Sequence, residues 1–213
     1  MFEQLTALDA VGPYEVLQRL PGAEVTFVGR DRGSIRSDNG FLGLSVDAAF
    51  DEVHAADVLV VPGGIGCRAL LDDEQVLSWV RSIHETTRYT TSVCTGSLVL
   101  GAAGLLDGLE ATTHWAEMDA LAAYGARPTH ERVVPQGRII TAAGVSSGID
   151  MALTLLGQLA GDDVARAVQL GIEYDPQPPY DAGSVAKAGP ELTELVRAAL
   201  DAENEVAATP PDR

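Results

Sequence analysis

The residue best suited to chemistry in this chain of 213 residues is Cys94, in the segment Ser92-Val-Cys-Thr-Gly-Ser97. An apolar run, Tyr89–Val93, precedes it, and a helical pattern of small residues follows from Gly96. A reactive side chain between a strand and a helix is typical of a nucleophile elbow, whose sharp turn exposes it. A helix N-terminus also lowers a thiol pKa below the value of about 8.5 for a free cysteine. We therefore expect a nucleophilic thiolate, with a buried, inert cysteine as the alternative.

A second predicted strand, Val58–Val61, runs directly into the glycine-rich turn Pro62-Gly-Gly-Ile-Gly66. A tight turn of this kind leaves backbone N–H groups uncovered, and such groups can hydrogen-bond a developing anion. The turn is not a phosphate-binding loop, because no Gly-Lys-Ser or Gly-Lys-Thr follows it. A turn whose glycines serve geometry alone is the alternative. Cys67, just beyond this turn, lacks the strand-to-helix context and is expected to be structural.

Two side chains are candidate proton partners for Cys94. His114 lies twenty residues downstream, before Trp115, and a Cys–His pair is one arrangement. The carboxylate of Asp9, at a probable helix start, is the other. Each has a plainer interpretation, since a histidine beside a tryptophan can be a packed structural residue and an aspartate at a helix start can be an N-cap.

The remaining titratable residues are expected to take no part in chemistry. Glu15 is expected at the surface or in an interface. His54, His84 and His130 have no cysteine, aspartate or histidine at a metal-ligand spacing, so no metal site is predicted.

The elements that must position these residues alternate along the chain. Apolar strands that alternate with helices predict an α/β fold with a doubly wound, mostly parallel sheet of the flavodoxin-like type, in which ligands bind beyond the carboxyl ends of the strands. The strands are expected at Val25–Val28, Val58–Val61, Tyr89–Val93, Glu131–Val134 and Ile139–Thr141. The helices are expected near Ala10–Leu20, Asp73–Glu85, Gly96–Ala103, Trp115–Tyr124 and Gly148–Ala160, with one more that runs to about Ile172 from Asp162 as its N-cap.

Composition and charge exclude several classes of protein. The 14 basic and 31 acidic residues give a net charge of −17, which disfavours binding to nucleic acids or anionic membranes. Two cysteines are too few for a disulfide scaffold and fit a reducing compartment. The N-terminus has no basic and apolar signal pattern, and the uncharged run 89–106 fits a strand and a buried helix better than a membrane span. We therefore expect a cytoplasmic protein.

Together these motifs resemble the ThiJ/PfpI superfamily, which shares its fold with the class I glutamine amidotransferases, and within it the isonitrile hydratases. The resemblance extends from Asp9 to about Ser184, so a single domain is expected over residues 1–185, followed by a helix and a polar tail over 186–213. The segments that carry it are Leu8–Val16, Val61–Gly66, Thr91–Leu106, Ala111–Trp115, His130–Val134 and Val168–Ser184.

The resemblance implies a homodimeric enzyme without a cofactor that hydrates a small isonitrile to an N-substituted formamide. Cys94 would attack the terminal carbon and form a thioimidate. Asp9, with a pKa raised by burial, would protonate that carbon and later assist water. Thr95 would orient the intermediate through its backbone N–H or hydroxyl. The substrate would be bound by a set of residues beside the nucleophile, Gly63, Gly64, Ile65 and His114.

The chain departs from the family pattern at its start. Family members place an apolar strand inside the sheet before the acidic residue, whereas only eight residues precede Asp9 here, Glu3 and Gln4 among them. No full strand fits this length, so we expect a truncated first strand and a compromised sheet.

Three other functions remain open. A different thiol enzyme of the superfamily, glyoxalase-like or stress-response, would pair Cys94 with a histidine. A ligand sensor related to AraC-type regulators would need a basic helix-turn-helix domain, for which the roughly 29 residues after Ser184 are too few and too acidic. An amidotransferase subunit is the weakest alternative, because the adjacent His130 and Glu131 would point to opposite faces of a strand.

Overall fold

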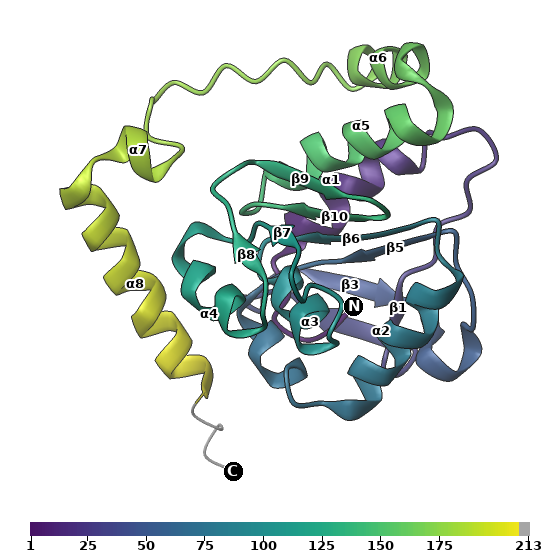
Figure 1. Ribbon diagram of the computed structural model, residues 1–213, viewed down its shortest axis with the longest axis horizontal. Helices are drawn as coiled ribbons and strands as arrows, with labels where there is room; N and C mark the ends of the chain where they lie inside the picture. The colour runs from purple at the N-terminus through teal and green to yellow at the C-terminus, as the bar shows by residue number, and fades with distance from the viewer. Residues whose placement is uncertain (209–213) are drawn as a thin grey trace. The chain divides into compact units, whose positions relative to one another are not determined.

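Figure 1 shows the computed structural model, which describes residues 1–208. The chain divides into two compact units, the first formed by residues 1–172 and the second beginning at Glu173. The boundary that the sequence predicts after residue 185 stays a prediction, and residues 209–213 of the predicted polar tail lie outside the described residues.

The main sheet of the first unit has four strands in the order β5-β6-β10-β9. The first three run parallel, and β9 pairs antiparallel with β10. Val61 pairs with Ser92 and Ala142 with Val93, so the carboxyl ends of β5, β6 and β10 lie side by side. The strands are β5 (Val58–Val61), β6 (Tyr89–Val93), β9 (Val133–Gln136) and β10 (Ile139–Ala142).

Helices cover both faces of this sheet, as the alternating pattern of the sequence predicts. On one face, α1 (Ala7–Leu17) and α5 (Ser147–Ala160) pack against each other, and Met151 and Leu155 of α5 form a core with Val93 and Ile140. On the other face, Leu59 and Val61 pack against residues of α2 (Glu74–Thr86) and α3 (Gly96–Ala102). The fold is therefore a doubly wound α/β fold, as predicted.

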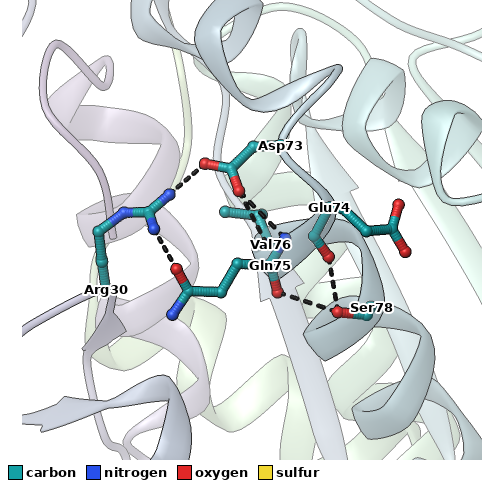
Figure 2. A network of polar contacts seen from close by, with 6 residues as sticks. All are labelled: Arg30, Asp73, Glu74, Gln75, Val76 and Ser78. Atoms are coloured by element: carbon teal, nitrogen blue, oxygen red, sulfur yellow. Dashed lines mark hydrogen bonds and ion pairs between the residues drawn. The ribbon is translucent and has the colours of Figure 1, made fainter.

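The α2 helix begins with a capped N-terminus (Figure 2). The carboxylate of Asp73 accepts hydrogen bonds from the backbone N–H groups of Gln75 and Val76, at 3.1 and 3.4 Å. Such a cap satisfies donors that have no partner within the helix. Arg30 contacts the carboxylate of Asp73 and the side-chain oxygen of Gln75, and so connects the chain that follows β1 (Val28–Gly29) to this helix.

Three short strand pairs surround the main sheet. The parallel pair β1–β4 begins only at Val28, so the predicted strand Val25–Val28 is wrong in extent, and Val25 is exposed. The pairs join β1 (Val28–Gly29) to β4 (Ala48–Ala49), β2 (Gly33–Arg36) to β3 (Gly43–Val46) and β7 (Glu110–Ala111) to β8 (Arg127–Pro128).

The remaining helices of the first unit are short. Asp162 is the first residue of α6 rather than its N-cap, because Gly161, at φ +89°, makes the turn from α5. The remaining helices of the first unit are the 3₁₀ helices η1 (Phe50–Glu52), η2 (Ile65–Leu70) and η3 (Trp115–Glu117), with α4 (Met118–Ala123) and α6 (Asp162–Gly171).

The second unit contains α7 (Val185–Ala188) and α8 (Pro190–Ala208). None of the helices within residues 1–208 combines the length and the apolar character needed to span a bilayer.

Candidate active site

Cys94 occupies a strained turn between β6 and α3. Its φ of +56° is unusual for a residue other than glycine, and it turns the chain sharply at the carboxyl end of the strand. The turn is held from several sides. The backbone N–H of Cys94 donates to the carbonyl oxygens of Ala142 and Ala143, at 3.0 and 3.1 Å, and its carbonyl oxygen accepts from the hydroxyls of Thr113 and Ser97. These contacts fix the position of the sulfur.

The thiol of Cys94 is buried, with 5% of the residue exposed. Burial and the neighbouring Asp9 carboxylate raise the pKa of Cys94 above its ordinary value, and hydrogen bonds from the backbone N–H groups of Val145 and Thr95 lower it less. The expectation of a thiolate stabilised by the helix N-terminus is therefore wrong, because the cost of an anion in a dry site exceeds the gain from two N–H donors.

Asp9 lies fully buried in the first turn of α1, next to Cys94. Because α1 begins at Ala7 with Thr6 as its N-cap, Asp9 is not a helix cap. Its Oδ2 accepts a hydrogen bond from the backbone N–H of Gly63 at 3.0 Å, and its Oδ1 is buried without a hydrogen-bond partner among the described residues. An unpartnered carboxylate oxygen in this position is free to hold or transfer a proton.

Burial raises the pKa of Asp9 to about 7, although the Gly63 N–H and the Cys94 thiol both favour the charged form. This direction is the one expected from the sequence. At neutral pH the carboxyl group therefore exchanges its proton readily, as a general acid must.

The glycine turn after β5 contacts both Asp9 and Thr95. The N–H of Gly64 donates to the hydroxyl of Thr95 at 2.9 Å, and that hydroxyl lies 3.2 Å from the carbonyl oxygen of Gly64. Since the N–H of Gly63 is taken by Asp9, the expectation that these two N–H groups are uncovered is wrong. The turn positions Asp9 and Thr95 instead of offering free donors at Gly63 and Gly64.

Gly63 lies where three functional residues meet. A methyl group on it would lie 2.8 Å from the Oδ2 atom of Asp9, 2.8 Å from the Cβ atom of Cys94 and 2.6 Å from the backbone nitrogen of Thr95. Carbon atoms do not approach that closely, so the position admits no side chain without a shift of the nucleophile or the acid.

His114 and Ile65 lie at the edge of this arrangement. His114 caps η3, where its Nδ1 accepts from the N–H of Ala116 at 3.4 Å, and its ring packs against Gly144. Ile65 opens η2 and is half-buried. Gly144 precedes the Val145 that donates to the Cys94 sulfur, so His114 supports the loop behind the nucleophile.

The other titratable residues, Glu15 and Cys67, each have a contact outside the group formed by Cys94 and Asp9. Glu15 is exposed and pairs with Arg19 at 2.7 Å. Cys67 is buried in η2, its sulfur 3.7 Å from the carbonyl oxygen of Pro62. Within residues 1–208, no three histidine, cysteine, aspartate or glutamate side chains come together as metal ligands do.

Sequence reasoning missed the loop after β10, residues 143–146. Because β10 is the direct neighbour of β6, this loop lies beside the elbow and supplies the N–H of Val145 to the sulfur. The signal was present, since Ala143-Gly-Val-Ser146 follows an apolar strand and precedes a helix, as the elbow does. The hydroxyls of Thr113 and Ser97 were also missed, and no spacing in the sequence would have assigned them to the Cys94 carbonyl.

Known proteins resemble this chain over most of its length. Residues 1–158 match the DJ-1/PfpI family. A protein of Pseudomonas putida named isonitrile hydratase is 50% identical over 184 residues, which are 86% of this chain and 80% of that protein. A ThiJ/PfpI family protein from Pseudomonas syringae, solved by crystallography, has 37% sequence identity and a TM-score of 0.91, and the match covers 97% of this chain and 86% of that one.

About half of a transcriptional regulator is also similar to this chain. The HTH-type transcriptional regulator GbdR of Pseudomonas aeruginosa is 29% identical over 184 residues. The match covers 82% of this chain and 48% of the regulator.

Proposed function

Because this chain belongs to the DJ-1/PfpI family, we propose that it is a hydratase which converts an isonitrile, R–N≡C, to the N-substituted formamide, R–NH–CHO. The relative named isonitrile hydratase, identical at half of the aligned positions, supports the substrate class. The observation that carries the mechanism is the buried pair of Cys94 and Asp9, in which burial raises the pKa of the thiol and raises the pKa of the carboxyl group to about 7.

In the first half of the reaction, the thiol adds across the terminal carbon of the isonitrile. Asp9 gives its proton to that carbon, which carries the lone pair, and so makes it electrophilic. The sulfur of Cys94 then forms a bond to the carbon, and the thiol proton passes to the Asp9 carboxylate. The product is a thioimidate, R–N=CH–S–Cys94, and Asp9 is again protonated. The high thiol pKa is no obstacle, because protonation of the carbon precedes or accompanies attack.

In the second half, water replaces the sulfur. Asp9 gives its proton to the nitrogen and takes one from the water that adds to the thioimidate carbon, which forms R–NH–CH(OH)–S–Cys94. The carbon–sulfur bond then breaks and releases the formamide. The N–H groups of Val145 and Thr95 point at the sulfur and stabilise the negative charge that develops on it as it leaves. The proton of the adduct's hydroxyl passes by way of Asp9 to the thiolate, and the net reaction is the addition of one water to one isonitrile.

The remaining candidate residues surround this chemistry. Thr95 contributes its N–H to the sulfur and its hydroxyl to Gly64, so it positions both the nucleophile and the glycine turn. Gly63 leaves room for the carboxyl group of Asp9. We place Gly63, Gly64, Ile65 and His114 around the substituent R of the substrate.

The direct test is to incubate the protein with an aryl isonitrile and follow the formamide by chromatography, beside a Cys94→Ala variant of confirmed fold. Turnover by the native chain and none by the variant is the expected result. No turnover by the folded native chain would contradict the proposal and favour a ligand-sensing role. A loss that is far greater in His114→Ala than in Asp9→Asn would favour a different thiol enzyme with a Cys–His pair.

We also infer, from the resemblance, that the enzyme is a homodimer. Sedimentation velocity at micromolar concentration tests this point, and a single monomer boundary would contradict it.

A further inference from the structure

His84 is buried at the end of the main sheet opposite to the active site. It lies in the last turn of α2, with 7% of the residue exposed. Both nitrogens of its ring have a partner. Nδ1 lies 2.8 Å from the hydroxyl oxygen of Thr90, and Nε2 lies 2.8 Å from Nη2 of Arg138. The partners of a buried histidine determine which of its nitrogens carries the proton.

Arg138 determines the tautomer of His84. A guanidinium group donates hydrogen bonds and accepts none, so Nε2 accepts from Nη2 and carries no proton. The single proton of the neutral ring is therefore on Nδ1, which donates it to the hydroxyl of Thr90. The charge state of the ring is fixed by the same argument, because only a neutral imidazole has an acceptor nitrogen.

The other hydrogen bonds around the ring agree with this assignment. The hydroxyl of Thr87 donates to the carbonyl oxygen of His84 at 3.0 Å, so its oxygen accepts from the hydroxyl of Thr90 at 2.8 Å. Nη1 of Arg138 donates to the carbonyl oxygens of His84 and Thr87, at 2.7 and 3.1 Å. Every donor in this His84 cluster, formed by His84, Thr87, Thr90 and Arg138, has an acceptor as long as Nε2 is unprotonated.

The His84 cluster connects three elements of the main unit. Arg138 directly precedes β10, Thr90 lies in β6, and Thr87 ends α2 as its C-cap. The backbone N–H of Thr90 also donates to the carbonyl oxygen of Arg138 at 2.9 Å. The strands β6 and β10 are neighbours (Figure 1), and the turn of Cys94 is held at their carboxyl ends. The cluster therefore fixes the amino ends of the same two strands.

A second proton on the ring would break this arrangement. An Nε2–H would face the N–H of Nη2, and an imidazolium would lie against a guanidinium of the same charge. The charged groups that act on the ring are Arg138, from the segment before β10, and Glu85, the next residue of α2, whereas β6 contributes the uncharged hydroxyl of Thr90. Burial and Arg138 lower the pKa of His84, and Glu85 opposes them.

We propose that His84 is an acid-sensitive latch: the neutral ring holds Arg138 against the end of α2 and the start of β6, and protonation at Nε2 releases Arg138 and loosens this end of the sheet. An unfolded histidine has a pKa of 6.5, so the unfolded chain takes up this proton first as the pH falls. The stability that the latch contributes is therefore complete above about pH 6.5 and is lost progressively below it.

The first test measures the ring itself by NMR in the native chain. Nitrogen-15 shifts of the His84 ring, assigned through its backbone, report the tautomer and the titration midpoint. We expect the Nδ1–H tautomer at about pH 7.5 and a midpoint below 6.5, which Arg138→Gln should raise. An Nε2–H tautomer, or a midpoint at or above 6.5, would overturn the proposal. This test stands even where a variant does not fold.

The second test measures the loss of stability on acidification. Tm is determined at about pH 7.5 and pH 5.0 for the native chain, for His84→Gln and for His130→Gln, which removes an exposed histidine outside the cluster. Between these two values, Tm of the native chain should change toward lower stability by roughly 2–4 °C relative to His84→Gln. His130→Gln should follow the native chain. The contribution of Asp9 has the opposite sign and is common to all three proteins, so it cancels. Equal changes in the native chain and His84→Gln would contradict the latch.

The third test locates the loosening. Amide hydrogen exchange, corrected for the intrinsic effect of pH, gives the protection factor of the Thr90 N–H, whose acceptor is the carbonyl oxygen of Arg138. It should fall at least about fivefold between pH 7.5 and pH 5.0 in the native chain and stay nearly constant in His84→Gln. Constant protection in the native chain would overturn the proposed release. None of these measurements depends on isonitrile turnover, so they stand apart from the proposed function.

Discussion

The ends of the neighbouring strands β6 and β5 each lead to a buried cysteine, yet only one of them is placed for catalysis. Cys94 stands at a φ of +56°, with two backbone N–H groups directed at its sulfur and a carboxyl group beside it. Cys67 lies in the 3₁₀ helix η2, with its sulfur near a carbonyl oxygen and its pKa raised by burial to about 12. Since both thiols are buried, burial alone does not separate a nucleophile from a core residue.

The difference lies in the acid and in the kind of donor, since Cys94 has two backbone N–H groups at its sulfur whereas the hydroxyl of Thr95 favours the charged form of Cys67. N–H groups stabilise a sulfur anion, whereas a carbonyl oxygen next to sulfur does the opposite. The strained turn at Cys94 is what directs the N–H groups of Val145 and Thr95 to its sulfur. The following predictions alter one component of this contrast at a time.

Removal of the acid should have the largest effect. Asp9→Asn keeps the size of the side chain and loses the transferable proton, so we expect kcat for isonitrile hydration to fall by roughly 10²–10⁴. In the native enzyme, kcat should decrease above about pH 7, because Asp9 loses its proton there. The variant should lack this limb in its pH–rate profile. A variant with native kcat would remove Asp9 from the mechanism.

The same carboxyl group should set a pH dependence of stability. Its pKa is about 7 in the folded chain against an ordinary value of 3.8, so the unfolded chain loses this proton first. The free energy of unfolding should therefore decrease as pH rises from about 4 to about 7, by roughly 2–4 kcal/mol from this group. Urea melts across this range should show a smaller decrease for Asp9→Asn, and equal slopes for both proteins would contradict the shift.

Gly63→Ala should disturb the acid and the nucleophile together. Its methyl group would lie 2.8 Å from both the Asp9 carboxylate and the Cβ atom of Cys94, so we expect kcat/KM to fall by about 10²-fold and stability by roughly 1–3 kcal/mol. Gly171→Ala is the matched control, because its Cβ would meet nothing within 4 Å. If the two variants were equally active, the close packing around Gly63 would have no role in catalysis.

Thr113→Val should have a smaller effect. The hydroxyl of Thr113 donates to the carbonyl oxygen of Cys94 at 3.0 Å, and valine has nearly the same shape without the donor. The loss of one neutral hydrogen bond corresponds to about 1 kcal/mol. We expect a several-fold lower kcat with KM nearly unchanged, since the bond orients the elbow and does not touch the substrate. Thr193→Val is the control for the substitution itself, and a native kcat in Thr113→Val would contradict the positioning role.

Cys67→Ala should change activity least. We expect turnover within about threefold of the native value and a loss of roughly 1 kcal/mol in stability from the small cavity left behind. Turnover and the free energy of unfolding are measured for this variant and for Cys94→Ala, which should lose turnover without a comparable loss of stability. Loss of turnover in Cys67→Ala would mean that the two strand ends share the chemistry.

Much of the fold could be predicted from the sequence because the parallel strands of the main sheet are short uncharged runs rich in β-branched residues. The strands at Val58–Val61 and Tyr89–Val93 are found within their predicted bounds, and the helix predicted between them at Asp73–Glu85 is found at Glu74–Thr86. The strand expected at Val25–Val28 shrinks to Val28–Gly29, because the pairing with β4 begins only at Val28 and Val25 is exposed. Apolar composition predicts a strand, but not whether a neighbour is there to pair with it.

The sequence predicted which residues form the candidate site, but it did not predict the direction of the shift in the thiol pKa. Cys94, Asp9, Gly63 and Thr95 do come together in the structure, while their catalytic roles stay predictions. The lowered thiol pKa was wrong, because a pattern of residue types gives the helix N-terminus but not the depth of burial. Val145 was missed for a similar reason, since only the order of the strands shows that its loop faces the elbow.

The burial of Cys94 also determines which reagents can label it. With 5% of the residue exposed and a carboxyl group alongside, the thiol excludes bulky electrophiles and repels anionic ones. Alkylation also requires the thiolate, which the raised pKa of Cys94 makes scarce at neutral pH. Small, uncharged alkylating agents should therefore label this cysteine slowly and faster as pH rises, whereas iodoacetate and large maleimide dyes should label it least.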